Sequence, residues 1–261
     1  MPEQLSLALA QAYESTLGLL AGVVPPGALP DIIKIAIGSF LGAGLAVLLA
    51  WLRYSAARRQ NRKAAGNLAI VTLDRLANDF ALARAVILSY REFILSERPR
   101  LPPWMHVKAA HFSHAGTLRF DLPALAFLLE DERGAQIARK LLVAESTYHD
   151  FFGLLRDYMG VAETIREKLA AAGLDPMDAG RAGEAAGAAT VARAERLAHA
   201  ILAHVERSEA VFREAAAVLH AALARRFGKK GLGSIEIPTY TQLRKILEAS
   251  EDALRTPPIH P

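Results

Sequence analysis

Histidines are the side chains of this chain best suited to chemistry, because the sequence contains no cysteine. Three of them, His106, His111 and His114, lie close together in the segment WMHVKAAHFSH. Imidazole is a good ligand for zinc, copper or nickel, so the three could converge on one ion. The only carboxylate close by is Asp121, and a flexible loop rarely preorganises a metal site. We therefore expect surface or packing roles for these histidines, with a metal site as the alternative.

A second group of chemically capable residues pairs Glu145 with His149 and His204 with Glu209. If two long helices carry these pairs and form a hairpin, the two histidines lie roughly opposite each other. A metal ion or an acid–base pair could then be held between the helices. Polar residues at the edge of a helical bundle more commonly satisfy one another. The sequence therefore predicts no catalytic residue, no metal and no cofactor.

Sequence motifs of the common enzyme classes are missing. There is no P-loop, no GxGxxG fingerprint, no GxSxG elbow, no HExxH pair and no EF-hand loop. Without cysteine, disulfides, thiol nucleophiles and iron–sulfur clusters are also excluded. We expect a protein that is not an enzyme.

The clearest single feature is an apolar stretch at residues 32–52, IIKIAIGSFLGAGLAVLLAWL, whose only charge is Lys34. At 1.5 Å per residue a helix of this length crosses a bilayer core. We predict a transmembrane helix over residues 32–53, with a buried core helix as the alternative. Gly38 and Gly42 form a GxxxG motif that predicts self-association of this helix in lipid.

The charge on the two sides of this stretch predicts its orientation. Residues 1–31 contain three acidic residues and no Lys or Arg, whereas residues 32–63 contain six basic residues and no acidic one. The positive-inside rule places the N-terminus outside and the C-terminal part in the cytoplasm. With Arg and Ala usage typical of a GC-rich bacterial gene, we expect a single-pass protein of the bacterial inner membrane. The residues expected to contact lipid headgroups are Arg53, Arg58, Arg59, Arg62 and Lys63.

Residues 5–24 are apolar but interrupted by polar side chains, including Glu14. We expect residues 1–31 to form a short interfacial amphipathic segment outside the membrane, with a second membrane pass as the alternative.

Heptad spacing dominates the rest of the chain. Apolar residues recur at steps of three and four from Leu73 to Ile94, from Ile137 to Leu169 and from Val191 to Ala222. Such stripes keep one face of a helix against a partner. We predict an all-α fold: one transmembrane helix followed by a cytoplasmic bundle of long antiparallel, coiled-coil-like helices. Heptads do not say whether the helices pack within one chain or between chains.

Proline and glycine place the connections between these helices. The first long helix occupies residues 54–98, and residues 99–132 form a loop with a short helix after Asp121. Residues 133–227 form a helical hairpin that turns at 173–187. Residues 228–261 form a linker, a short helix capped by Thr239 or Thr241, and a tail. Short extended pieces are expected at 117–120 and 234–237.

The loop after the first long helix is the best candidate for a partner interface. Trp104, Met105 and Phe112 are residue types enriched at interfaces. The alternative is that Trp104 plugs the end of the bundle. Outside residues 32–63 the charge is nearly balanced, so we expect no nucleic-acid partner.

The predicted function is that of a membrane-anchored scaffold, sensor or regulator that acts by binding a protein partner or by self-association. The alternative is a membrane-acting effector such as an oligomeric pore. The third reading is a metal-dependent enzyme in the bundle. The predicted partners are membrane lipid and either a second copy of the chain or another protein.

Overall fold

The fold is known from a computed structural model, which describes residues 29–108, 118–130, 132–175, 178–235 and 237–245. The chain divides into two compact units, residues 1–60 and residues 61–261. Helices dominate the described part of each unit, so the all-α class is confirmed. The described residues contain no strand, and the extended pieces expected around 118–120 and 234–237 find no strand to pair with.

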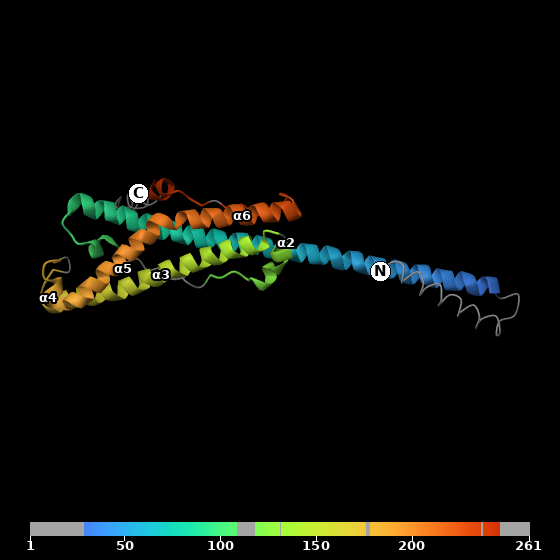
Figure 1. Cartoon of the computed structure of the whole chain (residues 1–261), viewed down its shortest axis with the longest axis horizontal. Helices are drawn as coiled ribbons and strands as arrows, with labels where there is room; N and C mark the ends of the chain where they lie inside the picture. The colour runs from blue at the N-terminus through green and yellow to red at the C-terminus, as the bar shows by residue number, and fades with distance from the viewer. Residues whose placement is uncertain (1–28, 109–117, 131, 176–177, 236, 246–261) are drawn as a thin grey trace, which may run out of the picture. The chain divides into compact units, whose positions relative to one another are not determined.

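Among the described residues, five α-helices and two 3₁₀ helices have both ends defined. Their bounds are α2 Leu29–Glu97, η1 Pro103–His106, η2 Pro123–Glu130, α3 Gly134–Ala171, α4 Ala182–Ala186, α5 Ala188–Arg207 and α6 Glu209–Phe227 (Figure 1). A further helix begins at residue 240, and its described part runs to residue 245.

The described part of the first unit is the beginning of α2. Large apolar side chains point outward here, among them Phe40 and Val47, which are 73% and 70% exposed. Trp51 is 62% exposed. This helix is long and apolar enough to cross a membrane. Water alone is a poor solvent for such a continuous apolar surface.

The second unit buries the three heptad stripes in one hydrophobic core. Leu73, Phe80 and Ile87 on α2 are at most 1% exposed. Every member of the α3 stripe from Ile137 to Leu169 is buried. Phe80 meets Phe151 of α3 edge to face at 4.9 Å between ring centroids, and it meets Phe212 of α6 at 5.1 Å. The stripes of α2, α3 and α6 therefore share one apolar interior.

The direction of α3 relative to α2 differs from the expected antiparallel arrangement. Arg62 at the start of this unit pairs with Glu130, just before α3, and Asp79 further along α2 accepts from Tyr148 of α3 at 3.0 Å. Residues further along α2 therefore contact residues further along the chain toward and into α3. The two helices run parallel (Figure 1). Of the described residues between the two helices, Trp104 lies beside Tyr158 of α3 and Glu130 lies beside Arg62, so the chain has returned along the unit before α3 begins. Lys140 near the start of α3 pairs with Glu214 of α6, and Lys168 near the end of α3 donates to the carbonyl of Ala186 in α4 at 3.5 Å, so the later helices return along α3 in the opposite direction.

The third predicted helix is bent into two. α5 ends at Arg207 and α6 begins at Glu209, with Ser208 between them at φ −83° and ψ −15°. Ser208 is 5% exposed and occupies the stripe position where an apolar residue would continue the seam. The bend lets α5 and α6 both pack on α3 (Figure 1).

Candidate interaction surfaces

The histidine-rich loop shows no metal-binding geometry in its described part. His106 is 8% exposed, and its Nε2 donates to the carbonyl oxygen of Leu101 at 2.9 Å. The Nε2 atom of His106 is therefore used in a hydrogen bond that stabilises the loop. His111, His114 and Phe112 lie outside the described residues.

Three of the four candidates on α3, α5 and α6 bind other groups: Glu145, His204 and Glu209, of which Glu209 pairs with Arg84. A carboxylate oxygen of Glu145 accepts from the backbone N–H of Phe120 at 2.8 Å, and Nδ1 of His204 lies 3.4 Å from the Ser208 hydroxyl. Nε2 of His149 is buried and has no hydrogen-bond partner among the described residues. Across the part of the chain that the structure describes, no three His, Asp or Glu side chains come together as metal ligands.

Trp104 and Met105 lie in the core rather than on the described surface. They are 3% and 5% exposed and pack in the same cluster as the helix stripes. Tyr158 of α3 donates to the carbonyl of Trp104 and lies 3.0 Å from that of Val107. Burial of this extent favours the alternative in which Trp104 plugs the end of the bundle over a role for Trp104 and Met105 in a partner interface.

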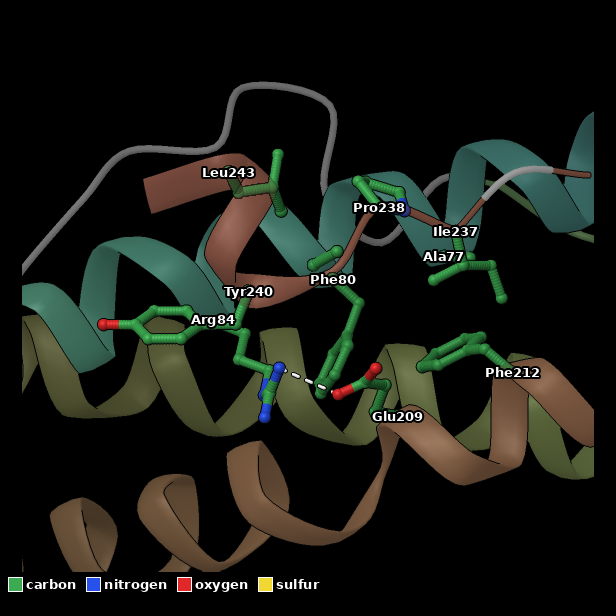
Figure 2. A pocket seen from close by; sticks show the side chains of 10 residues that line it. Ala77, Phe80, Arg84, Glu209, Phe212, Ile237, Pro238, Tyr240 and Leu243 are labelled. Carbon is green, nitrogen blue, oxygen red and sulfur yellow. Dashed lines mark ion pairs between the residues drawn. The ribbon is translucent and has the colours of Figure 1, made fainter. Parts of the chain in front are cut away.

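The C-terminal segment, residues 232–245, lies along α2 in the groove between α2 and α6. Ile237, Pro238, Tyr240 and Leu243 approach Phe80 and Phe212 there (Figure 2). The space left between them has a volume of about 10 Å³. Such a space holds at most one water molecule, so the segment fills the groove.

Arg84 lies at the centre of this contact. Its Nη1 is 2.8 Å from Oε2 of Glu209, and its guanidinium lies 5.8 Å from the centroid of the Tyr240 ring (Figure 2). The Nε of Arg84 donates to the carbonyl oxygen of Val205 at 3.0 Å. One cation therefore contacts α5, α6 and the C-terminal segment together.

Polar contacts hold the segment at both ends. Near its start, Asn67 donates to the carbonyl of Gly231 at 3.2 Å and accepts from the N–H of Gly233 at 3.3 Å. Near its end, both carboxylate oxygens of Glu92 are bound, one by the Tyr240 hydroxyl at 3.1 Å and the other by Arg244 at 2.9 Å.

A capping box starts the final helix of this segment. The N–H of Thr239 donates to the side-chain oxygen of Gln242 at 2.8 Å, and the N–H of Gln242 donates to the Thr239 hydroxyl at 3.4 Å. This reciprocal pair is a known helix-start signal. Of the two caps expected from the sequence, Thr239 is the one observed.

Basic side chains gather at the end of the second unit where α2 enters it. Arg62 and Arg226 converge on the carboxylate of Glu130 from opposite helices. Their hydrogen bonds, that of Arg226 first, hold the pKa of Glu130 below its usual value against the opposing effect of desolvation. Lys63 donates to the carbonyl of Lys230 at 2.7 Å. This end therefore has a fixed framework of cations around one carboxylate.

Further cations surround that framework and face solvent. Arg133, Arg225, Lys229 and Lys230 are all exposed. Arg133, Arg225 and Arg226 line an open hollow of about 570 Å³ together with Glu130 and Glu132.

The residues predicted to contact lipid fall in both units. Gly38 and Gly42 have open space where a Cβ would stand, as helix self-association requires. Arg53, Arg58 and Arg59 are exposed, whereas Arg62 and Lys63 are half-buried by the contacts above. Arg62 and Lys63 therefore also have a structural role.

Comparison with protein-family models, with curated proteins and with solved structures finds no match to this chain. Two contacts of this chain were not expected from its sequence: the groove contact of residues 232–245 and the convergence of Arg62 and Arg226 on Glu130. The Thr239-x-x-Gln242 pattern in the sequence indicates the start of the helix that lies in the groove. The convergence of Arg62 and Arg226 is revealed only by the packing of α2 beside α6.

Proposed function

We propose that this chain is a membrane-anchored helical protein that is not an enzyme and acts by binding other proteins or itself. The observation that carries the proposal is the composition of α2. One helix, Leu29–Glu97, contains both an exposed apolar stretch long enough to cross a bilayer and a stripe buried in the core of the second unit. A protein built in this way attaches a folded helical domain to a membrane.

The charge pattern supports an inner-membrane location with the second unit in the cytoplasm. Basic residues follow the apolar stretch, and residues 1–31 have none. Two measurements test this. We expect the chain to stay in the membrane pellet after an alkaline carbonate wash, and a reporter fused to its C-terminus to work only in the cytoplasm. Release by carbonate would contradict the anchor, and reporter activity outside would reverse the orientation.

Binding as the mode of action is tested by crosslinking in cells. The C-terminally tagged full chain is crosslinked, solubilised from membranes and purified, and its partners are identified by mass spectrometry. A stoichiometric foreign protein would define it as an adaptor or regulator. A chain that yields neither a foreign partner nor a self-crosslink would contradict the proposal.

Self-association through the membrane helix supports a second candidate, an oligomeric membrane effector. Its specific support is the open space around Gly38 and Gly42 on an exposed apolar helix. Recovery of self-crosslinks alone, together with loss of membrane potential on expression of the full chain, would favour this candidate. Gly38→Ile with Gly42→Ile should abolish both, while Ala43→Ile, about 120° around the helix from the Gly38–Gly42 face, should leave both unchanged.

A further inference from the structure

We propose that the basic end of the second unit docks on a membrane surface by binding the phosphate headgroups of anionic phospholipids. We call this surface the cationic end. Its seven basic residues are Arg62, Lys63, Arg133, Arg225, Arg226, Lys229 and Lys230. The inference rests on the proposed membrane anchor and adds a second, electrostatic contact to it.

Charge is concentrated at this end of the unit. In the sequence, three acidic residues at positions 130–132 neighbour Arg133, and Glu130 and Glu132 lie among the seven basic residues. The remainder of residues 61–261 contains 20 basic and 21 acidic residues. The excess positive charge of the unit therefore lies at the cationic end, and the rest of its surface has no net attraction for an anionic bilayer.

The geometry of the cationic end suits phosphate. Glu130 holds Arg62 and Arg226 in place, and Lys63 fastens the loop after α6 through the Lys230 carbonyl. Arg133, Arg225 and Arg226, together with Glu130 and Glu132, line a hollow of about 570 Å³ that is open to solvent. Guanidinium forks bind phosphate oxygens in pairs, and lysines add point charges around them.

An apolar side chain at the same end fits a lipid surface better than a soluble anion. Leu129, next to Glu130 in the sequence, is 57% exposed. An exposed leucine beside a cluster of cations is the combination found where proteins lie on the headgroup region of a bilayer.

The chain length between the apolar stretch and the cationic end brings that end within reach of the bilayer. Arg62 follows Leu52 by ten residues. A chain of that length spans at most about 35 Å, whatever its conformation. A tethered cation cluster meets the membrane at a high effective concentration, so weak headgroup contacts suffice for docking. Each Lys or Arg near an anionic surface contributes about 1 kcal/mol.

The test uses the full chain, which contains no cysteine and accepts single labels cleanly. Ala135→Cys and Ala171→Cys place a fluorophore at exposed positions near the two ends of α3. Each labelled protein is reconstituted into phosphatidylcholine vesicles with and without phosphatidylglycerol, and quenching by a nitroxide-labelled lipid is measured. We expect phosphatidylglycerol to increase quenching at position 135 but not at position 171, and high salt to reverse it.

Matched variants separate the cationic end from general charge. Arg225→Gln, Lys229→Gln and Lys230→Gln together should lower the docking equilibrium constant roughly 100-fold. Arg166→Gln, Arg193→Gln and Arg196→Gln remove three exposed cations from the other end of the unit and should leave it unchanged. Equal loss in both triple variants, or quenching at position 135 that does not depend on phosphatidylglycerol, would overturn the inference.

Two controls identify the source of the phosphate and the point of failure. Inorganic phosphate should displace the cationic end no better than chloride at equal ionic strength, and selective displacement would show that the hollow takes free phosphate instead. A carbonate wash of the same vesicles tests the anchor independently. A chain that resists the wash but shows no lipid-dependent quenching refutes the inference alone, whereas a chain that washes off refutes the proposed function.

Discussion

Arg84 of α2 and Glu209 of α6 form an ion pair at 2.8 Å across the bend that separates α5 from α6. The same guanidinium donates to the carbonyl of Val205 in the last turn of α5. A helix leaves its last carbonyls without partners inside the helix, and here a side chain from another helix supplies one. Arg84 therefore holds both sides of the bend.

Replacing Arg84 should weaken the fold more than replacing the other partner of Glu209. Arg84→Met removes the ion pair and the bond to Val205, and we expect it to lower the free energy of unfolding by about 1–3 kcal/mol. Arg213→Met removes a half-exposed partner of Glu209 and should cost less than about 1 kcal/mol. Urea unfolding in detergent, followed by circular dichroism, measures both. Equal losses would mean that Arg84 does not hold the bend.

Two glycines of α3 should respond oppositely to alanine. A Cβ at Gly134 would stand 2.2 Å from the carbonyl oxygen of Leu128 and 2.5 Å from Cα of Leu129, so Gly134→Ala must push η2 away from α3. We expect a loss of about 1–3 kcal/mol. At Gly153 nothing lies within 4 Å, and Gly153→Ala should stabilise the helix by up to about 1 kcal/mol. Melting temperatures that shift in the same direction would contradict this assignment.

The buried hydroxyl of Tyr158 should make stability depend on pH in alkaline solution. Burial raises the pKa of this hydroxyl, which Arg166 only partly opposes. The unfolded chain therefore loses the proton first, near pH 10, and the folded chain is destabilised as the pH rises above that value.

Tyr158→Phe tests this linkage. At neutral pH the variant should be less stable by about 1–3 kcal/mol, because the carbonyls of Trp104 and Val107 lose their donor. Above pH 10 the advantage of the natural chain should shrink by about 1.4 kcal/mol per pH unit. A difference between the two proteins that stays constant from neutral to alkaline pH would refute the raised pKa.

Trp104 should behave as a core residue. It is 3% exposed, and Trp104→Ala leaves a large cavity that we expect to cost about 3–5 kcal/mol. Phe93→Ala removes a ring that is 58% exposed and provides the control, with a loss below about 1 kcal/mol. A folded, fully stable Trp104→Ala variant that loses a crosslinked partner would instead restore Trp104 to the partner interface.

Sequence periodicity predicted which faces of the helices are buried but not how the helices are directed. The stripes through Leu73, Leu141 and Leu219 are buried because heptad spacing requires a partner along one face. The same spacing is satisfied by parallel and antiparallel neighbours. The choice for α2 and α3 depends on the path of residues 98–133, where the breakers mark helix ends but do not specify a route.

A candidate surface was predicted only where all of its residues lie in one segment of the sequence. The basic residues after the apolar stretch were visible because they lie close together in the sequence. The pairing of Arg62 and Arg226 with Glu130 joins residues separated by 68 and 96 positions, and no local pattern links them. Likewise, the polar Ser208 interrupts an apolar stripe, which the sequence shows. The bend at Ser208 results from the packing of α5 and α6 on α3, which the sequence does not show.

The parallel course of α2 and α3 also determines when the protein can fold during its synthesis. Phe80 needs Phe151 and Phe212, which follow it by 71 and 132 residues. At a translation rate of about 5–20 residues per second, α6 reaches Phe80 only about 7–26 s after Phe80 is made. Until α3 follows, the ribosome displays a helix with an apolar stripe and no partner, and the stripe stays only partly covered until α6 arrives. A nascent chain of this design should therefore depend on a chaperone until the last turn of α6 has left the ribosome.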